Sequence, residues 1–387
     1  MKNSKLFEKI VLNNKVEIKN RIAIAPITLY ASNPDGSMTD EEREYLKIRG
    51  TDIGIYIFGA SYVSKEGMTS NDFHFSISEK DIPGLEERAK IIKSQGAKVI
   101  NQINHAGCFA QKKDTGLSPV VPSADIAIKD AQNRGSNSKD FHELTDSEIK
   151  ELIGKYAYAV ELCIKSGYDG VEIHGANNFL IQQFYSPHTN KRNDNWGGSD
   201  EKRMNFALNI VDAACQVREK YKIPEFIIGY RLSPEEPYED GITMTETLKL
   251  VRALVKKPIQ YIHISQKDYF KKTRRGEGSG IERLKVIHNE TKGKVALIGV
   301  GGLKSEEAIN SAANSEFSEF VAVAMASLMN KDLGILLKEG KRDMINTELD
   351  PDHQEKYAIP SNLWKLCFEG LDWLPPLKGK PHKKVEE

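Results

Sequence analysis

The amino-acid sequence predicts an α/β protein built as a single (β/α)₈ TIM barrel, and three observations lead to this fold class. Short β-branched runs alternate with amphipathic helical stretches from residue 20 to residue 330. Eight runs of the strand type occur, and each is followed by a helical pattern. The runs are almost continuously apolar, which is typical of parallel strands with both faces buried. A doubly wound sheet would share the alternation, but the count of eight and the absence of GxGxxG after the first strand disfavour it.

The predicted elements follow one another in a regular order. Helix 39–49 begins with the capping sequence TDEE, and helix 145–166 begins with TDSE and ends before Gly167. Helix 199–221 opens with SDEK, which places acidic side chains where the helix dipole favours them. The strands are expected at residues 22–27, 53–58, 98–103, 169–174, 226–231, 259–265, 295–300 and 319–324.

Two segments depart from the alternation and define the expected domain organisation. Residues 106–144 are polar and rich in turn-forming residues, so we expect a lid or hairpin over one mouth of the barrel. Residues 1–344 would form the barrel together with this lid. Residues 345–387 would form an extension that packs on the barrel through Trp364 and Trp373, with a frayed basic end.

The composition disfavours several classes of function. Lysine plus arginine and aspartate plus glutamate both number 55, so net charge gives no reason to expect a nucleic-acid partner. The first 20 residues lack the apolar stretch of a secretion signal, and no run approaches the roughly 18 apolar residues of a membrane span. We therefore expect a cytoplasmic protein without membrane association. The four cysteines are far apart, so we expect neither a zinc nor an iron–sulfur site, and no other metal.

Polar side chains stand where the apolar strands end, which is where the chemistry of such barrels takes place. Each has an ordinary structural explanation: His105 and His263 could be hydrogen-bonded structure, and Gln102 could satisfy backbone groups. Arg231 could pair with the acids of the sequence SPEEPYED. Their convergence at one end of the barrel nevertheless predicts a polar ligand.

A redox flavin is a ligand that such residues could hold. It needs hydrogen bonds along its pyrimidine edge, small residues against its ring and a cation beside N1 and the C2 oxygen. It also needs backbone N–H groups for its phosphate. The residues able to meet these needs are Thr28, Ala60, Gln102, Arg231 and the turn at Gly301 and Gly302.

Four segments of the chain resemble the Old Yellow Enzyme family of flavin oxidoreductases, and the resemblance extends over about residues 5–335. The segments are NRIAIAPITLYAS (20–32), INQINHAG (100–107), VEIHGANNFLIQQFYSPHTNKRNDNWGGS (171–199) and GVGG (299–302). The third is the most specific, because it joins an EIH strand end, a QQFYSP helix and an N-R-x-D-x-W-G-G-S run.

The resemblance implies a tightly bound FMN that is reduced by NADH or NADPH and passes hydride to an enone, a quinone or a nitro compound. At matching positions it implies that His174 and Asn177 hydrogen-bond the acceptor oxygen, as in an oxyanion hole, and that Tyr30 lies at the rim of the acceptor pocket. Relatives are often dimers or tetramers, so the resemblance leaves a homo-oligomer open. The positions that it assigns to the cofactor are Ala25, Pro26, Ile27, Thr28, Ala60, Gln102, His174, Arg231, Ser265, Gly301, Gly302, Ala324 and Met325.

The chain departs from the family pattern in the acceptor pocket. Phe179 stands where many relatives have a tyrosine that protonates the acceptor. Either Tyr30, another tyrosine or water then supplies the proton, or the natural acceptor is not an alkene. Cys108 replaces a common arginine, and we assign it no catalytic role because its setting offers no clear partner that would stabilise a thiolate.

A further departure concerns the phosphate. Met325 stands where relatives often have an arginine, which removes one charge-assisted contact unless Lys267, Arg274 or Arg275 replaces it. The missing proton donor and the missing arginine leave an alternative function open: a catalytically weakened barrel that binds flavin or a nucleotide as a sensor.

Overall fold

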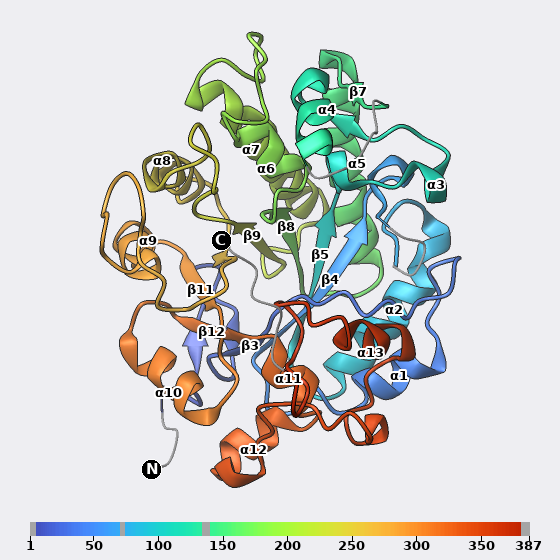
Figure 1. Cartoon of the computed structure of the whole chain (residues 1–387), viewed down its shortest axis with the longest axis vertical. Helices are drawn as coiled ribbons and strands as arrows, with labels where there is room; N and C mark the ends of the chain where they lie inside the picture. The colour runs from blue at the N-terminus through green and yellow to red at the C-terminus, as the bar shows by residue number, and fades with distance from the viewer. Residues whose placement is uncertain (1–4, 70–73, 134–139, 381–387) are drawn as a thin grey trace.

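The computed structural model describes residues 5–69, 74–133 and 140–380, and its centre is a closed barrel of eight parallel strands (Figure 1). The fold class and all eight predicted strands are confirmed. The hydrogen-bonded order around the barrel is β3, β4, β5, β8, β9, β10, β11 and β12, closing back on β3. The strand bounds are Ile22–Ile24 (β3), Ile55–Tyr62 (β4), Lys98–Asn104 (β5), Gly170–Gly175 (β8), Ile227–Leu232 (β9), Tyr261–Ile264 (β10), Ala296–Val300 (β11) and Phe320–Val323 (β12).

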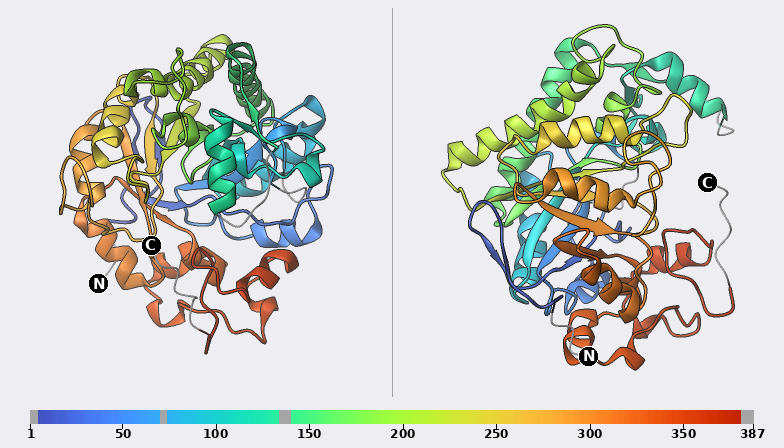
Figure 2. Two further views of the ribbon diagram at one scale, coloured as in Figure 1. Left: turned by 45° about the horizontal axis from the view of Figure 1, so that its top comes forward. Right: turned by 90° about the vertical axis from the view of Figure 1, so that its left-hand side faces the viewer.

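A helix follows each barrel strand and packs on its outer side (Figures 1 and 2). The predicted helix starts are confirmed by caps: the side chains of Thr39, Thr145 and Ser199 each accept a backbone N–H three residues later. Helix α1 ends at Leu46, earlier than predicted. The bounds are α1 (Asp40–Leu46), α2 (Ile82–Lys93), α5 (Asp146–Lys165), α6 (Leu180–Tyr185), α7 (Asp200–Tyr221), α8 (Met244–Leu254), α9 (Arg283–Thr291), α10 (Glu306–Ser315), α11 (Met325–Met329) and α12 (Leu333–Glu339).

The N-terminal end of the barrel is closed by a hairpin that the sequence analysis did not predict. Its antiparallel strands are β1 (Ile10–Val11) and β2 (Glu17–Ile18). Leu12 and Ile18 join the apolar cluster inside the barrel. The side-chain amides of Asn13 and Asn14 donate to backbone carbonyls at residues 224, 225, 259 and 294. Because this end is filled, the opposite mouth is the end that can receive a ligand.

The segment after β5 forms a small substructure of its own rather than a hairpin. It contains a 3₁₀ turn (Gly107–Phe109), α3 (Lys112–Thr115), β6 (Val120–Val121), α4 (Ala124–Asn133) and β7 (His142–Glu143), and β6 pairs with β7 in parallel. Arg192, from the run NKRND, donates to the carbonyls of Pro122 and Leu144. One side chain therefore ties the ends of β6 and β7 to the segment between α6 and α7. Residues 134–139 of the predicted lid lie outside the described residues.

The chain beyond the barrel packs beside α1 and α11 (Figure 1). It contains two 3₁₀ turns (Arg342–Met344 and Gln354–Lys356) and α13 (Ser361–Cys367). Trp364 is buried and stacks on Tyr357, whereas Trp373 keeps 42% of its surface exposed. The predicted frayed end, 381–387, lies outside the described residues. No helix in the described part of the chain combines the length and apolar character that crossing a membrane requires.

Candidate active site

The polar residues singled out in the sequence come together at the C-terminal mouth of the barrel. Strand register places His174, Arg231 and His263 side by side on β8, β9 and β10. Gln102 and Glu172 pair on β5 and β8, two residues below His174. Side chains two apart on a strand share a face, so both sets point into the barrel. The candidate site therefore has two polar layers.

His174 is a neutral imidazole with a fixed tautomer. It is 3% exposed, and burial followed by the nearby Arg231 lowers its pKa to about 3. Its Nδ1 accepts the backbone N–H of Ala176 at 3.2 Å. A neutral ring that accepts at Nδ1 must carry its proton on Nε2. Among the described residues Nε2 has no partner, so this N–H is available to a ligand.

Phe179 and Phe109 hold the His174 ring from the side. The Phe179 ring lies edge-on to His174 at a centroid distance of 5.0 Å, and Phe109 lies edge-on to Phe179 at 6.1 Å. Phe109 belongs to the 3₁₀ turn after β5. The phenylalanine that lacks a proton to give therefore packs against the histidine and limits its movement.

Asn177 is oriented by two serines, one of which is held by Arg231. Its backbone is left-handed, with φ 57°, and its N–H donates to Ser233 Oγ at 2.9 Å. Its Oδ1 accepts the Ser265 hydroxyl at 2.7 Å, and that hydroxyl in turn accepts from Arg231 Nη2 at 3.1 Å. Because Asn177 Oδ1 already accepts this hydrogen bond, its Nδ2 group is the part of the side chain that can donate to a ligand. Ser265, which the resemblance implies at the phosphate, thus bonds the side-chain amide of Asn177.

The lower polar layer contains Gln102, which the sequence pattern already indicated, and Glu172, which it did not. Gln102 Nε2 donates to Glu172 Oε1 at 2.6 Å, and His263 Nδ1 lies 2.9 Å from Glu172 Oε2. Glu172 and His263 are fully buried. Gln102 therefore bonds a carboxylate rather than backbone groups. A carboxylate in the apolar run VEIH, two residues before His174, was the signal that could have revealed it.

The opposite side of the mouth is lined by small residues. Register shifts between Phe58 and Ser61, so β4 has a bulge at Gly59 and Ala60. A Cβ on Gly59 would lie 2.3 Å from Pro26 Cβ, so only glycine lets the two strand ends approach this closely. Ala25 is buried beside them. This side is therefore tightly packed and lined by small side chains.

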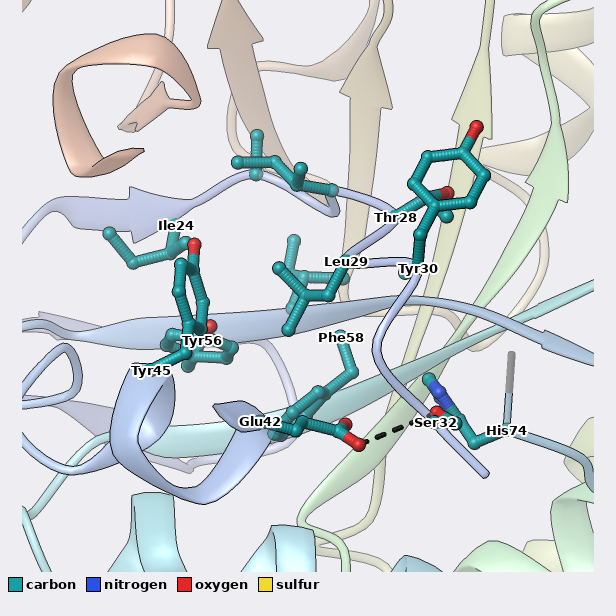
Figure 3. A pocket seen from close by; sticks show the side chains of 14 residues that line it. Ile24, Thr28, Leu29, Tyr30, Ser32, Glu42, Tyr45, Tyr56, Phe58 and His74 are labelled. Atoms are coloured by element: carbon teal, nitrogen blue, oxygen red, sulfur yellow. Dashed lines mark hydrogen bonds between the residues drawn. The ribbon is translucent and has the colours of Figure 1, made fainter. Parts of the chain in front are cut away.

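Tyr30 lies in the loop after β3, and its backbone is strained. Its φ is 51°, in the left-handed region that a bulky residue rarely adopts. Its carbonyl accepts from Asn362 of α13, so the C-terminal segment supports this loop. Figure 3 shows Thr28 and Tyr30 on one side of the loop, and Leu29 directed into the pocket between Tyr45, Tyr56 and Phe58.

The predicted phosphate seat consists of two turns at neighbouring strand ends. Gly301 (φ 140°) and Gly302 (φ 65°) follow β11, and Ala324 and Met325 follow β12. A Cβ on Gly301 would lie 2.7 Å from backbone atoms of Asp268, so this turn packs directly on the loop after β10.

The three cations proposed to replace the missing arginine have different surroundings. The guanidinium groups of Arg274 and Arg275 donate to carbonyls at residues 236, 238 and 239. Lys267 pairs with Asp372 of the C-terminal segment and is exposed. Its backbone carbonyl lies 3.3 Å from the position of a Cβ on Gly302. Of the three, Lys267 is the one whose main chain borders the glycine turn.

Two of the ordinary structural explanations are resolved by the contacts. His105 is buried, its pKa is lowered to about 4 by burial, and its Nδ1 accepts from Gly107 N, so it supports the turn after β5. Glu235 bonds Arg283, and Glu236 bonds Ser186. Arg231 is not paired with either acid.

The residues present fit FMN. Arg231 is 8% exposed, and its Nε has no hydrogen-bond partner among the described residues. A bound ligand could supply the acceptor that this buried cation lacks. Gln102, the small residues beside Gly59 and the glycine turn lie on different strands around the same mouth. Arg231 and Gln102 would hold the pyrimidine edge, and the turns after β11 and β12 would hold the phosphate. Within the described residues no group of three or more His, Cys, Asp or Glu could hold a metal ion.

A barrel whose mouth combines paired donors, small side chains and a glycine turn has the features of a flavin-dependent oxidoreductase. Comparison with known families agrees: the model of the NADH:flavin oxidoreductase / NADH oxidase family matches residues 5–344. The chain belongs to this family, and the predicted resemblance to Old Yellow Enzyme proteins is confirmed.

Several named relatives are similar to most of this chain. The chain is 38% identical over 372 residues to a probable NADH-dependent flavin oxidoreductase, YqiG, of Bacillus subtilis, covering 96% of this chain and 97% of the relative. It is 33% identical over 392 residues to an NADH:acrylate oxidoreductase of Vibrio harveyi, covering 99% of this chain and 38% of that protein. It is 32% identical over 370 residues to an NADH:fumarate oxidoreductase of Klebsiella pneumoniae, covering 95% of this chain and 39% of that protein.

Solved structures of the same architecture are more distant in sequence. Morphinone reductase in complex with tetrahydroNAD superposes with a TM-score of 0.76 at 23% identity, covering 92% of this chain and 97% of that one. The Old Yellow Enzyme homologue from Zymomonas mobilis gives 0.75 at 21% identity, covering 92% and 99%. At these identities the likeness shows the fold.

Proposed function

We propose that this protein oxidises NADH or NADPH and reduces an electron-poor acceptor whose oxygen is held by His174 and Asn177. When bound, FMN would supply hydride transfer from the nicotinamide to the acceptor. Nε2–H of His174 and Nδ2 of Asn177 donate to the acceptor oxygen, where negative charge develops as hydride arrives at the β-carbon. Because these donors are positioned beforehand, they stabilise that charge without reorganisation. The observation that carries the proposal is the pair of contacts that use up His174 Nδ1 and Asn177 Oδ1.

The acceptor class is best supported as an α,β-unsaturated carbonyl compound or carboxylate, a quinone or a nitro compound. Relatives named for acrylate and fumarate favour unsaturated carboxylates. The chain spans 38% and 39% of those two proteins, so their activities support the proposal only through the shared portion. Tyr30, at the loop after β3, is the candidate proton donor where Phe179 has none.

Alanine substitution of the two donors tests the proposal. We expect H174A and N177A each to retain bound FMN, seen by absorbance, while kcat with an enone falls about 10²–10³-fold, the usual loss for one oxyanion donor. The fall in kcat should exceed any change in acceptor binding, because the charge exists only in the transition state. The matched control is H353A, a half-exposed histidine paired with Glu355 in the C-terminal segment. Wild-type kcat in both active-site variants would show the donor assignment to be wrong.

The sensor alternative makes a different prediction. A sensor would bind FMN but consume no NADH with menadione above the rate of free FMN. Steady turnover that is lost in H174A supports the enzyme, and turnover equal to free FMN supports the sensor.

A further inference from the structure

A fully buried carboxylate lies directly below the candidate site and bonds two of its neighbours. Glu172 accepts from Gln102 Nε2 at 2.6 Å on β5 and from His263 Nδ1 at 2.9 Å on β10. The exposed fraction of the side chain is 0% for both Glu172 and His263. The carboxylate of Glu172 on β8 therefore links β8 to β5 and to β10.

The protonation states of this network are fixed by its surroundings. Burial opposes ionisation of Glu172, but His263, Arg231 and Gln102 together hold its pKa below the usual range. Burial also lowers the pKa of His263, which keeps the imidazole neutral despite the carboxylate. A neutral imidazole donates its Nδ1–H to an ionised carboxylate. The phenol of Tyr261 faces the same carboxylate, and burial and that charge raise its pKa.

An ionised carboxylate also determines which way the Gln102 amide points. A carboxylate only accepts hydrogen bonds, so Gln102 must direct its Nε2 group to Glu172 and its Oε1 away from it. The amide carbonyl of Gln102 is thereby left as the acceptor that a ligand can use. The ring N–H on the pyrimidine edge of a flavin is a donor, and this orientation matches it.

We propose that Glu172 is a positioning residue for the cofactor: it orients Gln102 toward the pyrimidine edge and places a fixed negative charge below it, opposing Arg231. The inference rests on the proposed function, since it concerns the same FMN site. Reduced FMN carries more negative charge near N1 and the C2 oxygen than oxidised FMN. Arg231 therefore favours the reduced form, and Glu172 weakens that preference. Stability of the fold alone gives no reason for the carboxylate, because replacing buried ionic networks with apolar side chains is often neutral or stabilising.

The reduction potential of bound FMN tests this role, using the full chain loaded with FMN. In E172Q we expect the two-electron potential to rise by about 30 mV, equivalent to a tenfold gain in preference for reduced FMN. A residue that only supports packing would lower the melting temperature and leave the potential unchanged. E235Q is the matched control: Glu235 is also buried and paired, with Arg283, and its loss should lower stability without moving the potential.

A second variant keeps the inference testable if E172Q does not fold. E172D keeps the charge but withdraws the carboxylate from Gln102, so we expect a nearly unchanged potential and about tenfold weaker binding of oxidised FMN. Wild-type potential in E172Q, or wild-type FMN affinity in E172D, overturns the inference while the proposed function stands. A wild-type protein that binds no FMN overturns both.

Discussion

The two halves of the barrel mouth are built from opposite kinds of side chain. The half formed by β5, β8, β9 and β10, here called the polar half, carries Gln102, Glu172, His174, Arg231 and His263. The half formed by β11, β12, β3 and β4, here called the small half, carries glycines and alanines.

The two halves have different tasks: the polar half orients hydrogen-bonding groups, and the small half makes room for close backbone packing. In the polar half each hydrogen bond fixes the direction of a group that faces the mouth, as Ser265 does for Asn177. In the small half the absence of side-chain atoms lets backbone segments approach each other, as Gly59 does with Pro26. Substitutions in the small half should therefore affect how tightly FMN binds, whereas substitutions in the polar half should also change the reduction potential or the turnover of bound FMN.

Adding one carbon atom to the small half should have the largest effect on FMN binding. The Cβ of G59A would lie 2.3 Å from Pro26 Cβ, so the strand end must shift. We expect about 10–100-fold weaker FMN binding, measured by fluorescence quenching, in line with the 1–3 kcal/mol cost of overpacking.

The same substitution elsewhere is the control. Gly154 in α5 has no atom within 4 Å of its added Cβ, and G154A should bind FMN normally. It should also raise stability slightly, as glycine to alanine does inside a helix. Equal FMN affinity in G59A and G154A would show that close packing in the small half does not determine FMN binding.

The buried histidines should make the polar half sensitive to acid. His105 and His174 have pKa values lowered to about 4 and about 3, chiefly by burial. Below pH 6.5 the unfolded chain binds protons that the folded chain does not, so the free energy of unfolding falls as pH decreases. We expect each histidine to cost about 1.4 kcal/mol per pH unit in that range. Urea unfolding at pH 7.5 and 5.5 measures this, and H174Q should reduce the slope; an unchanged slope would contradict the assignment.

Much of this architecture could be predicted from the sequence, because it depends on local patterns. Buried strands give continuous apolar runs, and the caps at Thr39, Thr145 and Ser199 mark helix starts. The hairpin of β1 and β2 could not, since strands of two residues have no periodicity. The parallel pair β6 and β7 depends on Arg192, which lies far along the chain.

The candidate site shows the same division. His174 and Asn177 follow from one motif, VEIHGANN. Glu172 lies in that motif too, but its meaning depends on Gln102 and His263, which only strand pairing brings near. The bond from Ser265 to Asn177 likewise joins residues 88 apart.

Placing an arginine at position 325, in the small half, should change FMN binding less than G59A does. M325R would place a guanidinium at the turn after β12, and we expect about tenfold tighter FMN binding at low salt through one charge-assisted contact. The gain should shrink as ionic strength rises. M344R, at a position 60% exposed in the C-terminal segment, is the control and should leave FMN affinity unchanged. If M325R and M344R behave alike, Met325 does not face the phosphate.

The smallest expected effect concerns proton supply in the polar half. F179Y would add a hydroxyl beside His174. A well-positioned general acid contributes about 10²–10⁴-fold, but this ring is packed on a histidine, so we expect a gain of less than about tenfold in enone reduction. The rate with menadione, which needs no carbon protonation, is the internal control. A matching rise with menadione would mean that the hydroxyl acts on something other than the proton.

The hairpin at the closed end of the barrel has a consequence for the order of assembly. The amides of Asn13 and Asn14 meet carbonyls that lie 210 to 281 positions later in the chain. Contacts between such distant segments form slowly, because a long loop must close before they contribute. The hairpin of β1 and β2 is therefore among the last parts of the chain to dock. Until it docks, the apolar side chains inside the barrel are exposed to water.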